Sequence, residues 1–248
     1  TDDARWLAAA VACGEFLLAH LRLDDRRWRR SWQSTDADPA SGTTRHLAYA
    51  ADHAALLEAF IALYEATGEG RWLDEARAVA DTLVALFWDD EAGGVFTTGS
   101  DAERLVTRPK DLMDNPSPSA NSLTAVGLLR LAALTGTAAD RERAEAIVRL
   151  LGEPAGRHPT AFGHLLVAVD LLERGTTEIV VTGDRPDLVG EVQRRWLPGA
   201  VLAWGRPQPT PLWEGRNETG TDGRAYVCRG YVCAAPASTV EDLIDRLP

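Results

Sequence analysis

The segment from residue 108 to residue 122 combines side chains of several chemical types. It contains a guanidinium at Arg108, the chain's only lysine at Lys110, a carboxylate at Asp114, and the polar side chains of Ser119 and Asn121. A helix N-terminus flanked by cations can hold a carboxylate, a phosphate or a sugar hydroxyl. We expect Arg108, Lys110, Ser119 and Asn121 to bind substrate and Asp114 to be catalytic. In the structural alternative, Ser119 or Asn121 caps the next helix and Arg108 pairs with Asp114.

Asp52 and His53 form a second candidate site on an expected helix. Asp52 shares one helical stripe with three apolar residues, Leu56, Ala59 and Leu63. Its carboxylate should therefore face inward, where it needs a cation such as Arg108 or Lys110, or takes the raised pKa of a general acid or base. We expect Asp52 and His53 to be catalytic, and Asp52 with Asp114 or Glu58 could supply the two carboxylates that glycoside hydrolysis needs. The alternative is a structural ion pair.

The remaining histidines and cysteines suggest less chemistry. His46 and His53 are seven positions apart on one expected helical face, but no third ligand follows at metal spacing, so we expect no metal site and no cofactor. His164 lies on an apolar helix and should pack in the core. Cys228 and Cys233 fall in one expected strand, where residues five apart point to opposite faces, so we expect two buried thiols.

Most of the chain is predicted to form amphipathic helices, because apolar residues recur at a spacing of 3.6. Glycines at 68 and 136 mark two helix ends. Six helices in three hairpin pairs are expected, at residues 4–21, 47–67, 71–88, 119–134, 139–151 and 160–173. Strand-like loop segments are expected at residues 28–32, 94–98 and 104–108.

Internal repetition indicates how these helices are organised. Residues 5–7 (Arg-Trp-Leu) recur at residues 71–73, and the Thr-Gly pair at 67–68 returns at 135–136. Such a period fits a helical hairpin plus a long loop, so we predict a mainly α fold, a partial α/α toroid over residues 1–175. Residues 176–248 are expected to form a small α/β lobe. Its elements should be strands at 178–184, 201–204 and 225–233 and helices at 186–196 and 240–247.

Composition excludes several classes of protein. The 248 residues are 45% hydrophobic and 25% charged, as in a globular protein, and the net charge of −11 disfavours nucleic acid or an anionic membrane as partner. Apolar runs are too short to span a bilayer, no export signal is visible, and an odd number of cysteines suits a reducing compartment. We therefore expect a cytoplasmic protein. The chain begins with Thr, and we expect it to be a fragment or a processed product.

Four segments resemble a known family. They are residues 63–73 (LYEATGEGRWL), residues 108–122 with their RPK, Asp114 and PSANS, residues 178–183 (EIVVTG) and residues 225–236 (AYVCRGYVCAAP). Together they resemble the C-terminal part of the thioredoxin-domain family that includes spermatogenesis-associated protein 20 and bacterial YyaL-type proteins. The chain departs from the family pattern at residues 51–54, which read Ala-Asp-His-Ala in place of the family's LEDYA start, and at Ala120 in place of glycine.

The resemblance implies an α-toroid similar to that of N-acylglucosamine 2-epimerase and the six-hairpin glycosidases. Epimerases of this toroid type use histidines near the axis for proton transfer. It also implies a preceding thioredoxin-like domain and a first half of the toroid, neither of which is in this sequence. We expect a carbohydrate-like small molecule to be bound or processed at the toroid axis. The alternative is a non-catalytic accessory module for the thioredoxin-like domain. An open flank of the half-toroid would be covered by a homo-oligomer or by the missing N-terminal half.

Overall fold

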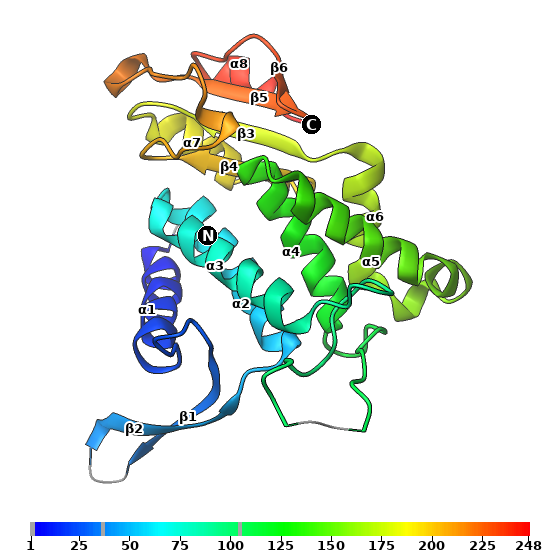
Figure 1. Ribbon diagram of the computed structural model, residues 1–248. Coiled ribbons are helices and arrows are strands. Elements are labelled where there is room, and N and C mark those ends of the chain that lie inside the picture. Colours follow the sequence, from blue (N-terminus) through cyan, green and yellow to red (C-terminus); the bar gives the residue numbers. More distant parts are fainter. Residues whose placement is uncertain (1–2, 36–37, 104–105) are drawn as a thin grey trace.

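The computed structural model describes residues 3–35, 38–103 and 106–248 of the chain (Figure 1). Its larger part is helical and its smaller part contains a mixed sheet. The helices of the larger part are α1 (Ala4–His20), α2 (Ala50–Thr67), α3 (Gly70–Phe87), α4 (Ala120–Thr135), α5 (Ala138–Arg157) and α6 (Gly163–Arg174). The six helices expected from apolar spacing are therefore confirmed, with ends that differ by a few residues.

The helices form two layers. Helices α2, α4 and α6 lie side by side, while α3 packs against α2 and α5 against α4 (Figure 1). Each hairpin turns tightly, because Gly68 and Gly136 end α2 and α4 in the left-handed conformation, with φ of 68° and 79°. Long loops precede α2 and α4, so the N-terminal ends of both helices are approached by irregular chain.

The loops contain less β-structure than expected in one place and more in another. A hairpin of β1 (Arg29–Thr35) and β2 (Asp38–Leu47) projects from the helical part (Figure 1). The sequence indicated the start of β1, whereas β2 was missed and its last residue was assigned to the next helix. Residues 94–98 form only a bridge between Val95 and Trp88. In the expected strand at 104–108, residues 104 and 105 lie outside the described part, and residues 106–108 are not strand.

The C-terminal lobe is a four-stranded sheet with strand order β4-β3-β5-β6. Strand β3 pairs in parallel with β4, and helix α7 connects the two strands as the expected βαβ crossover. Strand β5 pairs antiparallel with the other side of β3. The lobe elements are β3 (Thr177–Val181), α7 (Pro186–Gln193), β4 (Ala200–Trp204), β5 (Ala225–Arg229), β6 (Val232–Cys233) and α8 (Val240–Ile244).

The expected single strand at residues 225–233 is wrong. The chain reverses at Gly230 and Tyr231, both of which have positive φ, so β5 and β6 form a hairpin. Cys228 and Cys233 become directly opposed cross-strand partners and form a disulfide. The expectation of two buried thiols is therefore corrected, because it assumed that the strand continued through the turn.

The lobe and the helices share one core. Side chains alternate across β3, so Val180 packs with the helices while Ile179 and Val181 pack under α7 and α8. At the end of α2, the Glu65 carbonyl accepts a hydrogen bond of 2.8 Å from the Trp204 indole, and the Glu65 carboxylate accepts one of 3.2 Å from the Leu202 N–H. Strand β4 is thereby fastened to the C-terminal end of α2.

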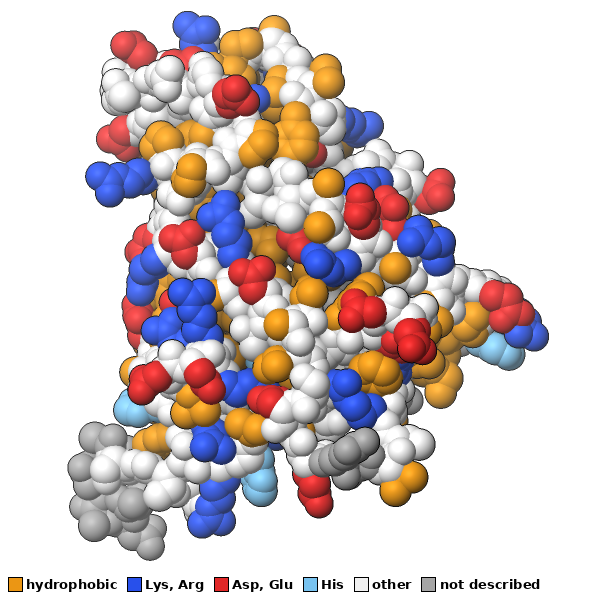
Figure 2. Space-filling view, viewed as in Figure 1, with side chains coloured by type: hydrophobic (Ala, Val, Ile, Leu, Met, Phe, Trp, Pro, Cys, Tyr) orange, Lys and Arg blue, Asp and Glu red, His pale blue; other side chains and the backbone are white. Residues whose placement is uncertain are grey.

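Charges are mixed over the surface seen in Figure 2, where acidic side chains lie among basic ones. This face presents no large area of one sign that would attract a polyanion. Within the described residues, no helix is both long enough and apolar enough to cross a membrane.

Candidate functional site

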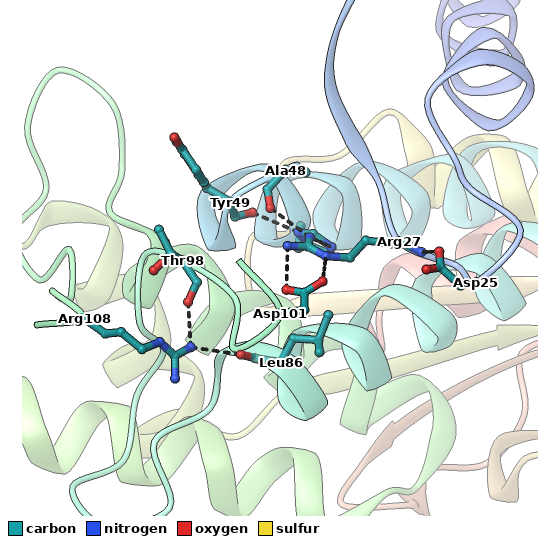
Figure 3. Close-up of polar contacts among 9 residues, drawn as sticks. Asp25, Arg27, Ala48, Tyr49, Leu86, Thr98, Asp101 and Arg108 are labelled. Atoms are coloured by element: carbon teal, nitrogen blue, oxygen red, sulfur yellow. Dashed lines mark hydrogen bonds and ion pairs between the residues drawn. The ribbon is translucent and has the colours of Figure 1, made fainter. Parts of the chain in front are cut away.

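The cations of the loop before α4 are used to hold that loop in place. Arg108 donates from Nη2 to the carbonyls of Leu86 and Thr98, at 3.0 and 2.6 Å (Figure 3). Its guanidinium also lies over the Phe96 ring. Lys110 forms a 2.7 Å ion pair with Asp89 and thereby lowers the pKa of that carboxyl. Both cations are therefore committed to the end of α3 and the loop that follows it. The alternative pairing of Arg108 with Asp114 does not form.

Ser119 and Asn121, two further predicted residues of this loop, form hydrogen bonds with backbone groups. Ser119 is the N-cap of α4 and accepts a hydrogen bond of 3.1 Å from the Ser122 N–H, as the structural alternative expected. Asn121 is fully buried and bonds both backbone groups of Val95, at 2.7 and 3.0 Å. Backbone groups in loops and at helix starts lack the hydrogen-bond partners that a regular helix or strand supplies. Each of these side chains provides one of the missing partners.

Asp114 connects the starts of two neighbouring helices. Its carboxylate accepts hydrogen bonds from the N–H groups of Ser119, His164 and Leu165, at 2.8, 2.7 and 3.2 Å. Partial burial raises the pKa of Asp114, but these hydrogen bonds outweigh it and leave the pKa below the usual value. Asp114 therefore serves the N-terminal ends of both α4 and α6.

Asp52 does not face inward with a buried cation. It is the third residue of α2, and its carboxylate accepts a 2.8 Å hydrogen bond from the Tyr49 N–H at the N-cap. Its cationic neighbour is Arg30, at 3.8 Å, rather than Arg108 or Lys110. Because the side chain remains partly exposed at the helix start, the expected inward carboxylate is not found.

His53 lies in a buried polar cluster around Arg27. The Arg27 guanidinium binds Asp101 at 2.8 and 3.1 Å and the Ala48 carbonyl at 2.8 Å (Figure 3). It also lies 3.4 Å from His53 Nε2. Burial, more than the nearby Arg27 charge, lowers the pKa of His53 to about 4 despite a hydrogen bond to Tyr49. His53 is thus a neutral core residue.

Asp52 and His53 thus lie at the N-terminal end of α2, and Asp114, Ser119 and Asn121 lie at the N-terminal ends of α4 and α6. His46 also differs from expectation, because it lies in β2 with φ of 57° rather than on a helical face with His53.

A different region of the structure is hollow. A cavity of about 790 Å³ lies against α2, α4 and α6, and α1 and the α7–β4 segment complete its wall. Its lining includes Trp6, Glu58, Glu65, Arg130, His164 and Trp196. A volume of this size suits a small-molecule ligand. We call it the inner-face cavity.

One polar pair of the inner-face cavity is suited to proton transfer. His164 Nε2 lies 3.5 Å from a Glu58 carboxylate oxygen, which raises the pKa of His164. Nε2 is itself buried, and it faces the Glu58 carboxylate. The expected core role of His164 is therefore incorrect: Leu165 and Ala168 carry the packing of α6, and His164 lines the cavity. An imidazole and a carboxylate in contact can exchange a proton with a bound molecule.

A second polar pair lies further along α2. Burial raises the pKa of Glu65, and the Arg130 guanidinium, 2.5 Å from its carboxylate, opposes that rise. Arg130 Nε is buried without a hydrogen-bond partner in the described part of the chain. Glu65 is therefore held by Arg130 and by the Leu202 N–H.

A signal for Glu58 and Glu65 was present in the sequence. They are seven positions apart with Ala62 between them at the spacing of one helical face, about 10 Å along the axis from first to last. An acidic stripe of this kind also describes a solvated helix face. Only the packing of α4, α6 and β4 around it identifies the stripe as the wall of a cavity.

The chain is 30% identical over 198 residues to spermatogenesis-associated protein 20 of Homo sapiens, and 33% identical over the same length to that of Rattus norvegicus. Each alignment covers 75% of this chain and 25% of the relative, so the chain spans about a quarter of those proteins. An uncharacterised protein of Caenorhabditis elegans is 25% identical over 253 residues, covering 98% of this chain and 34% of that protein. No protein-family model matches the chain. The chain thus has homologues named spermatogenesis-associated protein 20 over three quarters of its own length.

Proposed function

We propose that this chain is the toroid portion of a protein of the spermatogenesis-associated protein 20 family and binds a carbohydrate-like small molecule in the inner-face cavity. The observation that carries the proposal is the Glu58–His164 pair, with His164 Nε2 3.5 Å from the Glu58 carboxylate, in the lining of a cavity of about 790 Å³. A carboxylate and an imidazole in the wall of a cavity can accept hydrogen bonds from, and donate them to, the hydroxyl groups of a sugar.

The arrangement of the helices supports a toroid. Helices α2, α4 and α6 lie side by side as an inner layer, with α3 and α5 behind them. This is the alternation of inner and outer helices that an α/α toroid requires. The cavity lies against the inner layer, where the axis of such a ring would run.

The lining supports a sugar-like ligand. The Trp6 and Trp196 side chains are 67% and 87% exposed at the edge of the cavity, where a flat indole can pack against a sugar ring. The Glu58–His164 pair would move a proton to or from the ligand, as an isomerase or epimerase requires. In this proposal Asp52, His53 and Asp114 support the inner helices, and the reactive groups are Glu58 and His164.

A ligand titration tests this function. Saturating amounts of N-acetylhexosamines, hexoses and cellobiose are added separately, and the melting temperature is measured. We expect at least one sugar to raise it in a saturable way, because a ligand that binds only the native state stabilises it by RT ln(1 + [L]/Kd). Glu58→Gln and His164→Gln should each weaken binding about tenfold, through loss of a charge-assisted hydrogen bond.

The matched control is Glu173→Gln, which alters an exposed carboxylate at the far end of α6. It should bind the sugar as the parent chain does. Sugars that leave the melting temperature unchanged, or binding that is lost equally in the Glu173 variant, would contradict the proposal.

An accessory role is the second candidate, and exposed apolar side chains favour it. Leu7 and Val167, 40% and 37% exposed, join Trp6 and Trp196 around the cavity. Apolar patches of this kind mark surfaces that bind other proteins. If the chain forms a homodimer in sedimentation equilibrium that Trp196→Glu dissociates, and no sugar alters its melting temperature, the cavity region is a docking surface instead.

A further inference from the structure

The β5–β6 hairpin places two sulfur atoms at an accessible edge of the lobe. Strand β6 is the last strand of the sheet, and its Val232 is 79% exposed. Cys228 is buried at 1% exposure, whereas Cys233 is partly exposed on the edge strand. An approaching molecule can therefore reach the Cys233 side of the disulfide, while Cys228 is shielded by the sheet.

A cation is fixed directly against these sulfurs. Arg216 Nη2 lies 2.8 Å from Cys233 Sγ and 3.6 Å from Cys228 Sγ. The guanidinium is held by the Leu212 carbonyl and by the ring of Tyr226, whose centroid is 4.8 Å away. Among the described residues it forms no salt bridge, although the carboxylates of Glu218 and Glu178 lie near enough to interact with its charge.

A positive charge in contact with a sulfur favours the thiolate form, which is both the nucleophile and the leaving group of disulfide exchange. A disulfide that serves only to staple a fold needs no such neighbour. The combination here is an accessible sulfur, a shielded sulfur and a fixed guanidinium that contacts both.

We propose that Cys228, Cys233 and Arg216 form a thiol–disulfide exchange site whose substrates are thiols. The thiolate of an external thiol attacks Cys233 Sγ, the bond between Cys233 and Cys228 breaks, and Cys228 leaves as a thiolate beside Arg216. A second external thiolate attacks the external sulfur of this mixed disulfide and releases Cys233 as a thiolate. Two external thiols are oxidised to one disulfide, the protein disulfide is reduced to two thiols, and the two protons of the attacking thiols are taken up by Cys228 and Cys233.

The first experiment measures exchange with glutathione as the probe. The oxidised chain is mixed with reduced glutathione at pH 7, quenched with acid, and analysed by mass spectrometry after peptic digestion. We expect a transient mixed disulfide on Cys233. Its formation should be about tenfold slower in Arg216→Met, since a neighbouring cation typically changes thiol ionisation by about one pKa unit.

Two further variants make the result specific. Arg229→Met removes an exposed cation that is adjacent to Cys228 in sequence. Among the described residues, Arg216 rather than Arg229 contacts the two sulfurs, so the Arg229 variant should react within about twofold of the parent rate. Arg216→Lys keeps the charge and should retain most of the rate if the variant chain is folded, as judged by circular dichroism.

The internal reference is Cys13, a free and exposed cysteine on α1. After full reduction, iodoacetamide should modify Cys233 about tenfold faster than Cys13 at pH 7, and this excess should disappear in Arg216→Met. Equal rates at Cys233 and Cys13, equal exchange in the parent and Arg216→Met, or equal losses in Arg216→Lys and Arg216→Met would each overturn the proposal.

Discussion

His53 shows how burial determines what a histidine can do. Its ring lies against Arg27 and Phe87 in the interior, with Nδ1 2.9 Å from the Tyr49 carbonyl. Protonation would place a second positive charge beside the Arg27 guanidinium, which already pairs with Asp101. His164, by contrast, has a carboxylate at its Nε2 and a raised pKa. The pKa values of these two helical histidines are thus shifted in opposite directions by tertiary contacts.

The pKa of His53 predicts a pH dependence of stability. The folded-state value of about 4 lies below the unfolded value of 6.5, so the unfolded chain binds a proton first as the pH falls. The stabilisation is complete above pH 6.5 and is lost as the pH falls toward 4. Between pH 7 and pH 5, His53 should cost the parent about 2 kcal/mol of unfolding free energy.

Urea unfolding at several pH values measures this effect, with His53→Gln as the comparison. The variant lacks the titrating ring, so its unfolding free energy should fall less than that of the parent over the same interval. Parallel pH profiles for the two proteins would show that His53 is not the cause.

At the scale of elements, the inner helices are aligned by polar groups at their N-terminal ends. Asn121 ties α4 to the chain that follows α3, through Val95. Asp114 bridges α4 and α6 by accepting from N–H groups at both helix starts. The N–H groups of the first helical turn have no acceptor within their own helix. A loop side chain therefore supplies the acceptor and holds the N-terminal ends of α4 and α6 together.

Asp114→Ala should therefore weaken two helices at once. Three backbone N–H groups lose their acceptor, and we expect a loss of about 2–4 kcal/mol in the free energy of unfolding. Asp111→Ala is the matched control, because Asp111 accepts a single side-chain hydrogen bond of 3.4 Å from the Ala120 N–H and should cost well under 1 kcal/mol. Equal losses in the two variants, measured by urea titration, would contradict the bridging role.

At the scale of the whole molecule, the helical part and the lobe are joined by apolar packing. Val180 and Val201 of the lobe belong to the same core as Leu57 and Leu134 of the inner helices. The Tyr231 hydroxyl also donates to the carbonyls of Ala132 and Ala133, at 2.8 and 3.1 Å. The lobe therefore covers the C-terminal ends of α2 and α4.

This shared core predicts a single unfolding transition. Hydrogen exchange under increasing urea should show the amides of α2 and of β3 losing protection at the same denaturant concentration. Val201→Ala should lower both midpoints together, since the cavity it creates lies in the common core. A lobe that loses protection well before α2 would show that the two parts unfold independently.

The six helices and the βαβ crossover could be predicted from local spacing and motifs, but the grouping of the helices into three hairpin pairs could not, since α6 packs chiefly against α4. A helix with apolar residues every 3.6 positions and a glycine at its end, such as the one that ends before Gly68, specifies its C-terminal end, whereas its start at Ala50 lies three residues after the predicted one. The sequence also predicted that the polar residues of the loop before α4 lie at a helix start, and Ser119 is the N-cap of that helix.

Which polar side chains are already bound to other groups depends on contacts between distant parts of the chain. Asp52, Arg108 and Lys110 carry suitable chemistry, but nearby backbone groups and counterions occupy them. Glu58 and His164 meet from different helices, 106 positions apart in the chain, and no local spacing predicts that contact. The same reason explains the cysteines: a turn at Gly230 and Tyr231, rather than their separation along a strand, makes them neighbours. Local geometry is written into short windows of sequence, whereas the partner of a polar side chain depends on which surfaces the folded chain brings together.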